Sequence, residues 1–156
     1  MKKVFVMLIA GALLYACSGG NNNAADKKDE GSATATTGNP SYDPKRGEGK
    51  FKHVEIGDKL DAAKADAGKK IYDVKCSACH KLTTEKLVGP GWSGVSKKFA
   101  PEWIMNFITN PDAMIEKDPE LQSQLEICLV RMPNQNLSDE DARNILEFMR
   151  KNDGVQ

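Results

Sequence analysis

Cys76-Ser77-Ala78-Cys79-His80 is the stretch around which the rest of this sequence is organised. Its two thiols are about one helical turn apart, so both sulfur atoms can face the same side, and an imidazole follows directly. Two such thiols can add to the two vinyl groups of a haem as thioethers, and the histidine can then reach the iron. The motif therefore predicts covalent attachment of one haem through Cys76 and Cys79, with His80 as an iron ligand.

Two other chemistries also use closely spaced cysteines. A thioredoxin-like redox pair requires a βαβ context, and no such pattern surrounds the motif. A structural zinc site needs two more ligands at short spacing, and only the isolated residues Cys128 and His53 remain. Cysteine is also scarce, with 4 among 156 residues, so a chance match is rare. Haem attachment is the favoured interpretation.

The motif resembles the attachment site of class I monohaem c-type cytochromes, and the resemblance extends over roughly residues 60–152. In that family the first and last helices meet through a glycine and two aromatic residues, at positions matched here by Gly68, Tyr72 and Phe148. Membership would imply an all-α cytochrome c fold, in which several short helices surround one covalently bound haem c.

The resemblance also implies the surroundings of the iron. Pro90 lies in a glycine-rich loop, residues 87–95, that packs against the proximal histidine in this family and supplies a carbonyl for its Nδ1 proton. Met132, which precedes a proline 52 residues after His80, matches the sixth ligand. A thioether is a soft, neutral ligand that favours Fe(II) and raises the reduction potential. The expected metal ligands are thus His80 and Met132.

Three other methionines are candidates for the sixth iron ligand. Met114 is the main alternative because it lies near a proline-bounded turn, whereas Met105 and Met149 lie on helical faces and are expected in the core.

Apolar periodicity predicts helices and no convincing strand. The expected helices cover residues 60–75, 101–110, a segment that begins after 118, and 138–151. Pro101 suits a first helical position, and Pro111 is expected to end that helix. Asp118 is expected to cap the next helix, and Ser138 the last, with Asp141 as its capping-box partner.

The apolar faces of two helices are predicted from spacing alone. The face of the first helix is formed by Ala63, Ala67, Ile71 and Val74. The face of the helix after Asp118 is formed by Leu121, Leu125, Cys128 and Leu129. Cys128 is therefore expected to be a buried free thiol. Trp103 is expected to pack against the haem, and a hydrogen bond from its indole to a haem propionate is a weaker expectation. His53 is expected at the surface.

The chain begins with the features of an exported lipoprotein. Residues 1–16 combine two lysines with an apolar run too short to span a bilayer, as in a signal peptide. Leu14-Tyr15-Ala16-Cys17 resembles a bacterial lipobox, which makes Cys17 the expected lipid anchor. We expect a flexible tether over 17–44, an extended arm over 45–58, a cytochrome c domain over 59–152 and a tail over 153–156.

This organisation predicts a protein on the periplasmic side of a bacterial membrane. Ser18, the residue after the lipobox cysteine, does not decide whether the inner or the outer membrane holds the protein. Haem is attached to c-type cytochromes outside the cytoplasm, so the export signal and the haem motif predict the same location.

Charge is balanced overall, with 22 basic and 22 acidic residues, which argues against a nucleic-acid partner. Residues 59–98 nevertheless hold 9 basic and 4 acidic residues, while residues 99–156 hold 5 and 11. The basic half contains the haem motif. We therefore expect a basic surface at the haem edge that attracts acidic redox partners, with a solvated face as the ordinary alternative.

The expected function is to carry one electron between membrane respiratory complexes, to a terminal reductase such as a cytochrome oxidase or a nitrous-oxide reductase. No catalytic residue is expected. Two alternatives stay open at this point: a haem enzyme or gas or redox sensor with an open or labile sixth site, and a fixed haem subunit of a larger complex.

Overall fold

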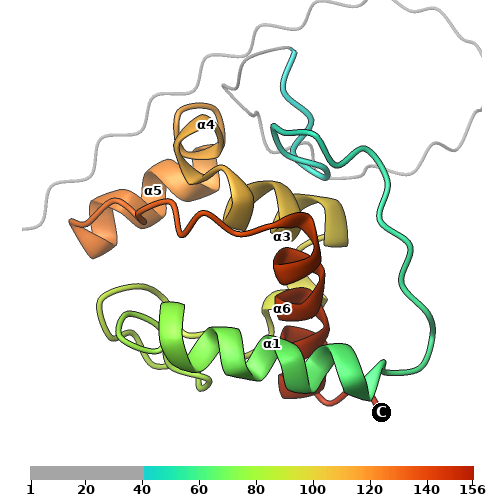
Figure 1. Cartoon of the computed structure of the whole chain (residues 1–156). Coiled ribbons are helices and arrows are strands. Elements are labelled where there is room, and N and C mark those ends of the chain that lie inside the picture. Colours follow the sequence, from blue (N-terminus) through green and yellow to red (C-terminus); the bar gives the residue numbers. More distant parts are fainter. Residues whose placement is uncertain (1–40) are drawn as a thin grey trace, which may run out of the picture. The chain divides into compact units, whose positions relative to one another are not determined.

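The computed structural model describes residues 41–156, in which the chain forms six helices and no regular strand (Figure 1). They are α1 (Ala62–Lys75), α2 (Val95–Lys98), α3 (Pro101–Thr109), α4 (Pro111–Ile115), α5 (Pro119–Cys128) and α6 (Asp139–Asn152). The predicted all-α class is confirmed. The predictions for the signal peptide, for Cys17 and for most of the tether fall outside the described residues.

The most extensive contact between any two of these helices is the one between α1 and α6, which cross each other (Figure 1). A β-carbon at Gly68 would overlap the carbonyl oxygen of Asn144, so only glycine allows this approach. Next to the crossing, the rings of Tyr72 and Phe148 pack with their centroids 5.5 Å apart. The predicted contact between the first and last helices is therefore confirmed.

The buried face of α1 differs from the one that spacing suggested. It is formed by Ala65, Gly68 and Tyr72, whereas Ala63 is exposed and Val74 is 83 % exposed. Alanines occur on more than one side of this helix, so apolar spacing alone did not identify the side that faces α6.

Pro111 does more than end the preceding helix. It is the first residue of α4, a short helix that the sequence analysis did not predict. A proline at a first helical position loses no intrahelical hydrogen bond, so the same residue ends α3 and begins α4.

Asp118 caps α5 as expected, because its Oδ1 accepts hydrogen bonds from the backbone of Glu120 (2.8 Å) and Leu121 (3.1 Å). The other end of α5 differs from the prediction. Leu129 lies beyond the helix at a φ of 59° and is 84 % exposed, so it is not part of the buried stripe. The last helix, α6, begins after Ser138 with the predicted capping box to Asp141.

Residues 45–58 form an arm without helix or strand that is held on the domain by α3. The buried side chain of Asn106 accepts a hydrogen bond from Phe51 N (2.9 Å) and donates to the carbonyls of Phe51 and Arg46 (both 3.0 Å). Tyr42, at the end of the predicted tether, donates its hydroxyl proton to Asp118. The contacts of the arm with the domain therefore extend back to Tyr42, beyond the predicted boundary at residue 44.

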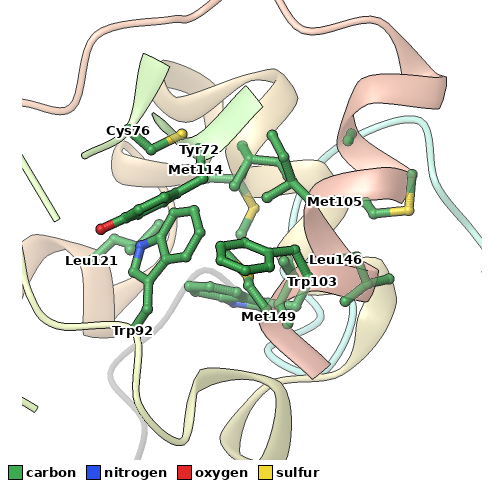
Figure 2. Packing of buried hydrophobic residues seen from close by; sticks show 14 of the residues in the cluster. Tyr72, Cys76, Trp92, Trp103, Met105, Met114, Leu121, Leu146 and Met149 are labelled. Atoms are coloured by element: carbon green, nitrogen blue, oxygen red, sulfur yellow. The ribbon is translucent and has the colours of Figure 1, made fainter. Parts of the chain in front are cut away.

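The core lies between these elements and is rich in aromatic and sulfur-containing side chains (Figure 2). Tyr72 and Trp92 lie side by side, with ring centroids 4.9 Å apart. Trp103 stacks on Phe99 at 3.9 Å. None of the helices formed by residues 41–156 is long and apolar enough to cross a membrane.

Candidate functional site

The Cys-Ser-Ala-Cys-His motif begins where α1 ends. The N–H of Cys76 donates to Tyr72 O (2.9 Å), and the N–H groups of Cys79 and His80 donate to Cys76 O (3.0 and 2.9 Å). The chain thus continues in a tight turn, and both cysteines line the same cavity. Burial raises the pKa of the Cys76 thiol to about 11, the reverse of the lowered pKa that a reactive redox cysteine needs.

His80 is oriented through two hydrogen bonds. Its Nδ1 donates to the carbonyl oxygen of Pro90 at 2.8 Å, and its own carbonyl accepts the Tyr72 hydroxyl proton at 2.6 Å. Burial lowers the pKa of the imidazole, and the Pro90 carbonyl acts in the opposite direction. A neutral ring with its proton on Nδ1 keeps the Nε2 lone pair available for a metal.

The loop after the motif folds back to support this histidine. Both Val88 N and Gly89 N donate to Cys79 O (3.2 and 2.9 Å), and Trp92 N donates to Lys81 O (2.9 Å). A β-carbon at Gly89 would overlap Cε1 of His80. Glycine therefore lets the backbone pass directly against the imidazole. Pro90, the next residue, supplies the carbonyl oxygen that accepts the hydrogen bond from His80 Nδ1.

Met132 lines the same cavity as His80. It is half-buried, belongs to a segment without regular structure between α5 and α6, and lines both regions of the cavity together with His80. Met114, the alternative ligand, is fully buried under the arm, where its sulfur accepts a hydrogen bond from Glu48 N (2.8 Å). Met114 does not line the cavity; Met105 is a core residue, and Met149 lines only one region.

The cavity consists of two adjoining regions of about 120 and 250 Å³. The smaller contains both motif cysteines. The two share an apolar wall and a few polar groups: His80, Pro90, Trp92, Phe107, Ile108, Leu121, Gln124 and Met132. In residues 41–156 no three His, Cys, Asp or Glu side chains are clustered for a metal ion, so the zinc alternative has no ligand set there.

The other candidate residues are placed as follows. Trp103 is buried and lines the larger region, where its indole N–H donates to Asp118 (2.8 Å); its hydrogen bond to a propionate stays a prediction. Cys128 is half-buried rather than buried and lines the smaller region. His53 is 77 % exposed beside Glu102 and lines neither region.

Several lining residues were missed by sequence reasoning. Trp92 lies within the loop at residues 87–95 and was not predicted as a lining residue, although an aromatic residue directly after Gly-Pro-Gly is a signal for packing against the neighbouring ligand. Its ring centroid lies 5.7 Å from that of His80. Gln124 and Lys98 gave no such signal, because polar residues on a helix are ordinarily solvated.

An all-α domain whose cavity is lined by two thiols, an imidazole with its Nε2 lone pair available and a thioether has the side chains of a covalent haem protein. The family model of cytochrome c matches residues 65–153. The chain therefore belongs to the cytochrome c family.

Solved structures agree with this assignment. Cytochrome c from Rhodothermus marinus is 36 % identical, with a TM-score of 0.65, over 67 % of this chain and 90 % of that one. An engineered form of the same cytochrome, Rma TDE, is 35 % identical with a TM-score of 0.64, over the same shares of the two chains. Among curated proteins, no significant match was found.

The cofactor is covalent haem c, and the chain is a haem protein of an electron-transfer family. The residues present fit this group: an apolar cavity, two thiols on one side and a backbone path at Gly89 that leaves the imidazole unobstructed. When bound, the haem supplies an iron that cycles between Fe(III) and Fe(II).

The close approach of Gly89 to His80 generates a test of the site. In Gly89→Ala the new methyl group must displace the imidazole, so we expect loss or weakening of the low-spin haem spectrum in the purified protein. Gly57→Ala is the matched control, because the nearest atom to its β-carbon would be 3.6 Å away. An unchanged spectrum in Gly89→Ala would show that His80 is not held where the structure places it.

Proposed function

We propose that this protein is a lipid-anchored electron carrier on the periplasmic side of a bacterial membrane. It passes one electron at a time between respiratory complexes, to a terminal reductase such as a cytochrome oxidase or a nitrous-oxide reductase. The observation that carries the proposal is that His80 and Met132 line one cavity with both motif cysteines.

In this proposal Cys76 and Cys79 would form the thioethers, and His80 and Met132 would be the two protein ligands of the iron. An iron with both positions filled has no place for a substrate and changes its geometry little between oxidation states. That arrangement suits electron transfer and disfavours chemistry at the metal. The Pro90 carbonyl supports the His80 side by fixing the tautomer of the ring.

Replacement of Met132 separates the carrier from an enzyme or gas sensor with an open sixth site. Met132→Leu keeps the side-chain volume but removes the sulfur, so the near-infrared methionine-to-iron band should disappear and CO should bind the reduced haem. The potential should fall by a sizeable part of the range of about 0.8 V that axial ligands span. Met114→Leu should change none of these properties. CO binding by the wild-type protein would instead favour the enzyme or sensor.

The mouth of the cavity offers a surface for a redox partner. We define the rim patch as the exposed apolar side chains from the two segments at this mouth: Leu87, Val88, Ile127, Leu129 and Val130. The segments are joined by a hydrogen bond from Lys86 Nζ to Ile127 O (3.3 Å), and Val88 and Val130 line the region that holds the motif cysteines. A partner covering the rim patch would lie over the haem edge.

Two lysines give the rim patch a positive border. Lys75 and Lys86 donate to backbone carbonyls, Gln135 O and Ile127 O, and neither forms an ion pair in the described part of the chain. Nearby, Lys81 and Arg131 are paired with Glu85 and Asp112. The charges of Lys75 and Lys86 thus support the proposal of an acidic partner.

Turnover with purified candidate reductases tests both the acceptor and this surface. With the acceptor that supports turnover, the double variant Lys75→Gln/Lys86→Gln should slow association several-fold at low salt, and the difference should vanish as salt screens the charges. Lys52→Gln/Lys97→Gln removes the same charge from two exposed lysines that belong neither to the rim patch nor to its border. Equal rates for the two double variants, or a salt-independent wild-type rate, would contradict a basic docking surface.

The anchor is tested separately. In the native exporting host, wild-type protein should fractionate with membranes and carry an acyl group on Cys17, whereas Cys17→Ser should be released into the soluble periplasmic fraction with its haem intact. Membrane retention of Cys17→Ser would contradict the lipid anchor without affecting the haem assignment.

A further inference from the structure

The chemistry of haem fixes which end of the cavity each edge of the porphyrin occupies. The two vinyl groups lie on neighbouring pyrroles, and the two propionates lie on the other two, at the opposite edge. Cys76 and Cys79 line only the smaller region of the cavity. With the vinyl edge bonded there, the propionate edge would lie on the side away from the cysteines, and the larger region, which neither cysteine lines, is the part of the cavity that could receive it.

The polar side chains at that end come from two short segments. Ser93 and Lys98 belong to the loop and helix α2 after the motif, and Glu120 and Gln124 lie one turn apart on α5. Lys98 is the one lysine or arginine among the described residues that line this region. Its Nζ lies 2.5 Å from Oε1 of Glu120. The ammonium of Lys98 is thus paired with the Glu120 carboxylate at the end of the cavity where the two propionate carboxylates are expected.

Trp103 does not take this role. Its indole N–H is already donated to Asp118, whose other oxygen is used by the backbone of α5. The indole proton of Trp103 is therefore already used in this structure, and the cationic donor at this end of the cavity is the ammonium of Lys98.

We propose that Lys98 binds a haem propionate and that Glu120 competes for the same ammonium, so that this pair adjusts the reduction potential of the haem. The inference rests on the thioether attachment of the proposed function, but not on the identity of any redox partner. A cation beside a propionate neutralises negative charge near the iron and favours Fe(II). A free Glu120 carboxylate adds negative charge and favours Fe(III).

Lys98 can change its partner from Glu120 to a propionate with little loss of folding stability. The side chains of Lys98 and Glu120 are 57 % and 42 % exposed, and ion pairs this exposed contribute little to stability. Lys98 Nζ also lies 4.8 Å from the ring centroid of Phe99, which keeps the ammonium at the edge of the cavity in either pairing. Charge-removing substitutions at these two positions should therefore leave a folded protein.

The test compares the reduction potentials of Lys98→Gln, Glu120→Gln and Lys97→Gln in the haem-loaded protein, at physiological salt. Lys97 is the neighbouring exposed lysine and does not line the cavity, so it controls for the loss of one surface charge. We expect a lower potential for Lys98→Gln, a higher one for Glu120→Gln and a much smaller shift for Lys97→Gln. Infrared difference spectra between the redox states should show a displaced propionate carboxylate band in Lys98→Gln and none in Lys97→Gln.

Two results would overturn the proposal: equal shifts for Lys98→Gln and Lys97→Gln, or a propionate band that does not respond to loss of Lys98. A fall in potential for Glu120→Gln would equally contradict the competition. The variants are compared only with intact haem and an unchanged methionine-to-iron band. Failure of this inference is thereby distinguished from failure of the axial ligation, which Met132→Leu tests.

Discussion

The close crossing of α1 and α6 at Gly68 is the constraint from which the geometry of the haem site follows. It positions Tyr72 between Phe148 and Trp92, and the Tyr72 hydroxyl then holds the carbonyl of His80. The imidazole is fixed from its other side by Pro90. A side chain at Gly68 would move α1 as a rigid body and would displace the start of the haem motif with it.

The two walls of the cavity differ in how firmly they are built. The wall with the motif is closed by backbone hydrogen bonds from residues 88–92 to Cys79 and Lys81. Another wall combines α5 with the irregular segment that carries Met132, where the hydrogen bonds are fewer and come largely from side chains. The wall that carries His80 therefore has the denser backbone hydrogen bonding, and the segment of Met132 can rearrange at a lower cost in free energy.

Much of this structure could be predicted from local chemistry. The attachment motif and the Asp118 and Ser138 caps each depend on residues close in sequence, whereas the role of the glycine at the helix crossing was expected from the family resemblance. The wrong predictions concern features that tertiary packing decides. The buried side of α1 and the start of α4 at Pro111 depend on which neighbour approaches, and no local pattern specifies that. Lys98 was overlooked because its significance comes from a cavity shape rather than from its own sequence context.

Asp118 links the arm to the wall of the haem cavity. Its carboxylate accepts the protons of Tyr42 and Trp103 and caps the helix that presents Leu121 and Gln124 to the cavity. A mechanical load applied to the chain before Tyr42 is consequently received by the same side chain that starts α5. The arm is thus connected through Asp118 to the α5 wall of the cavity, whereas the wall with the haem motif continues from α1.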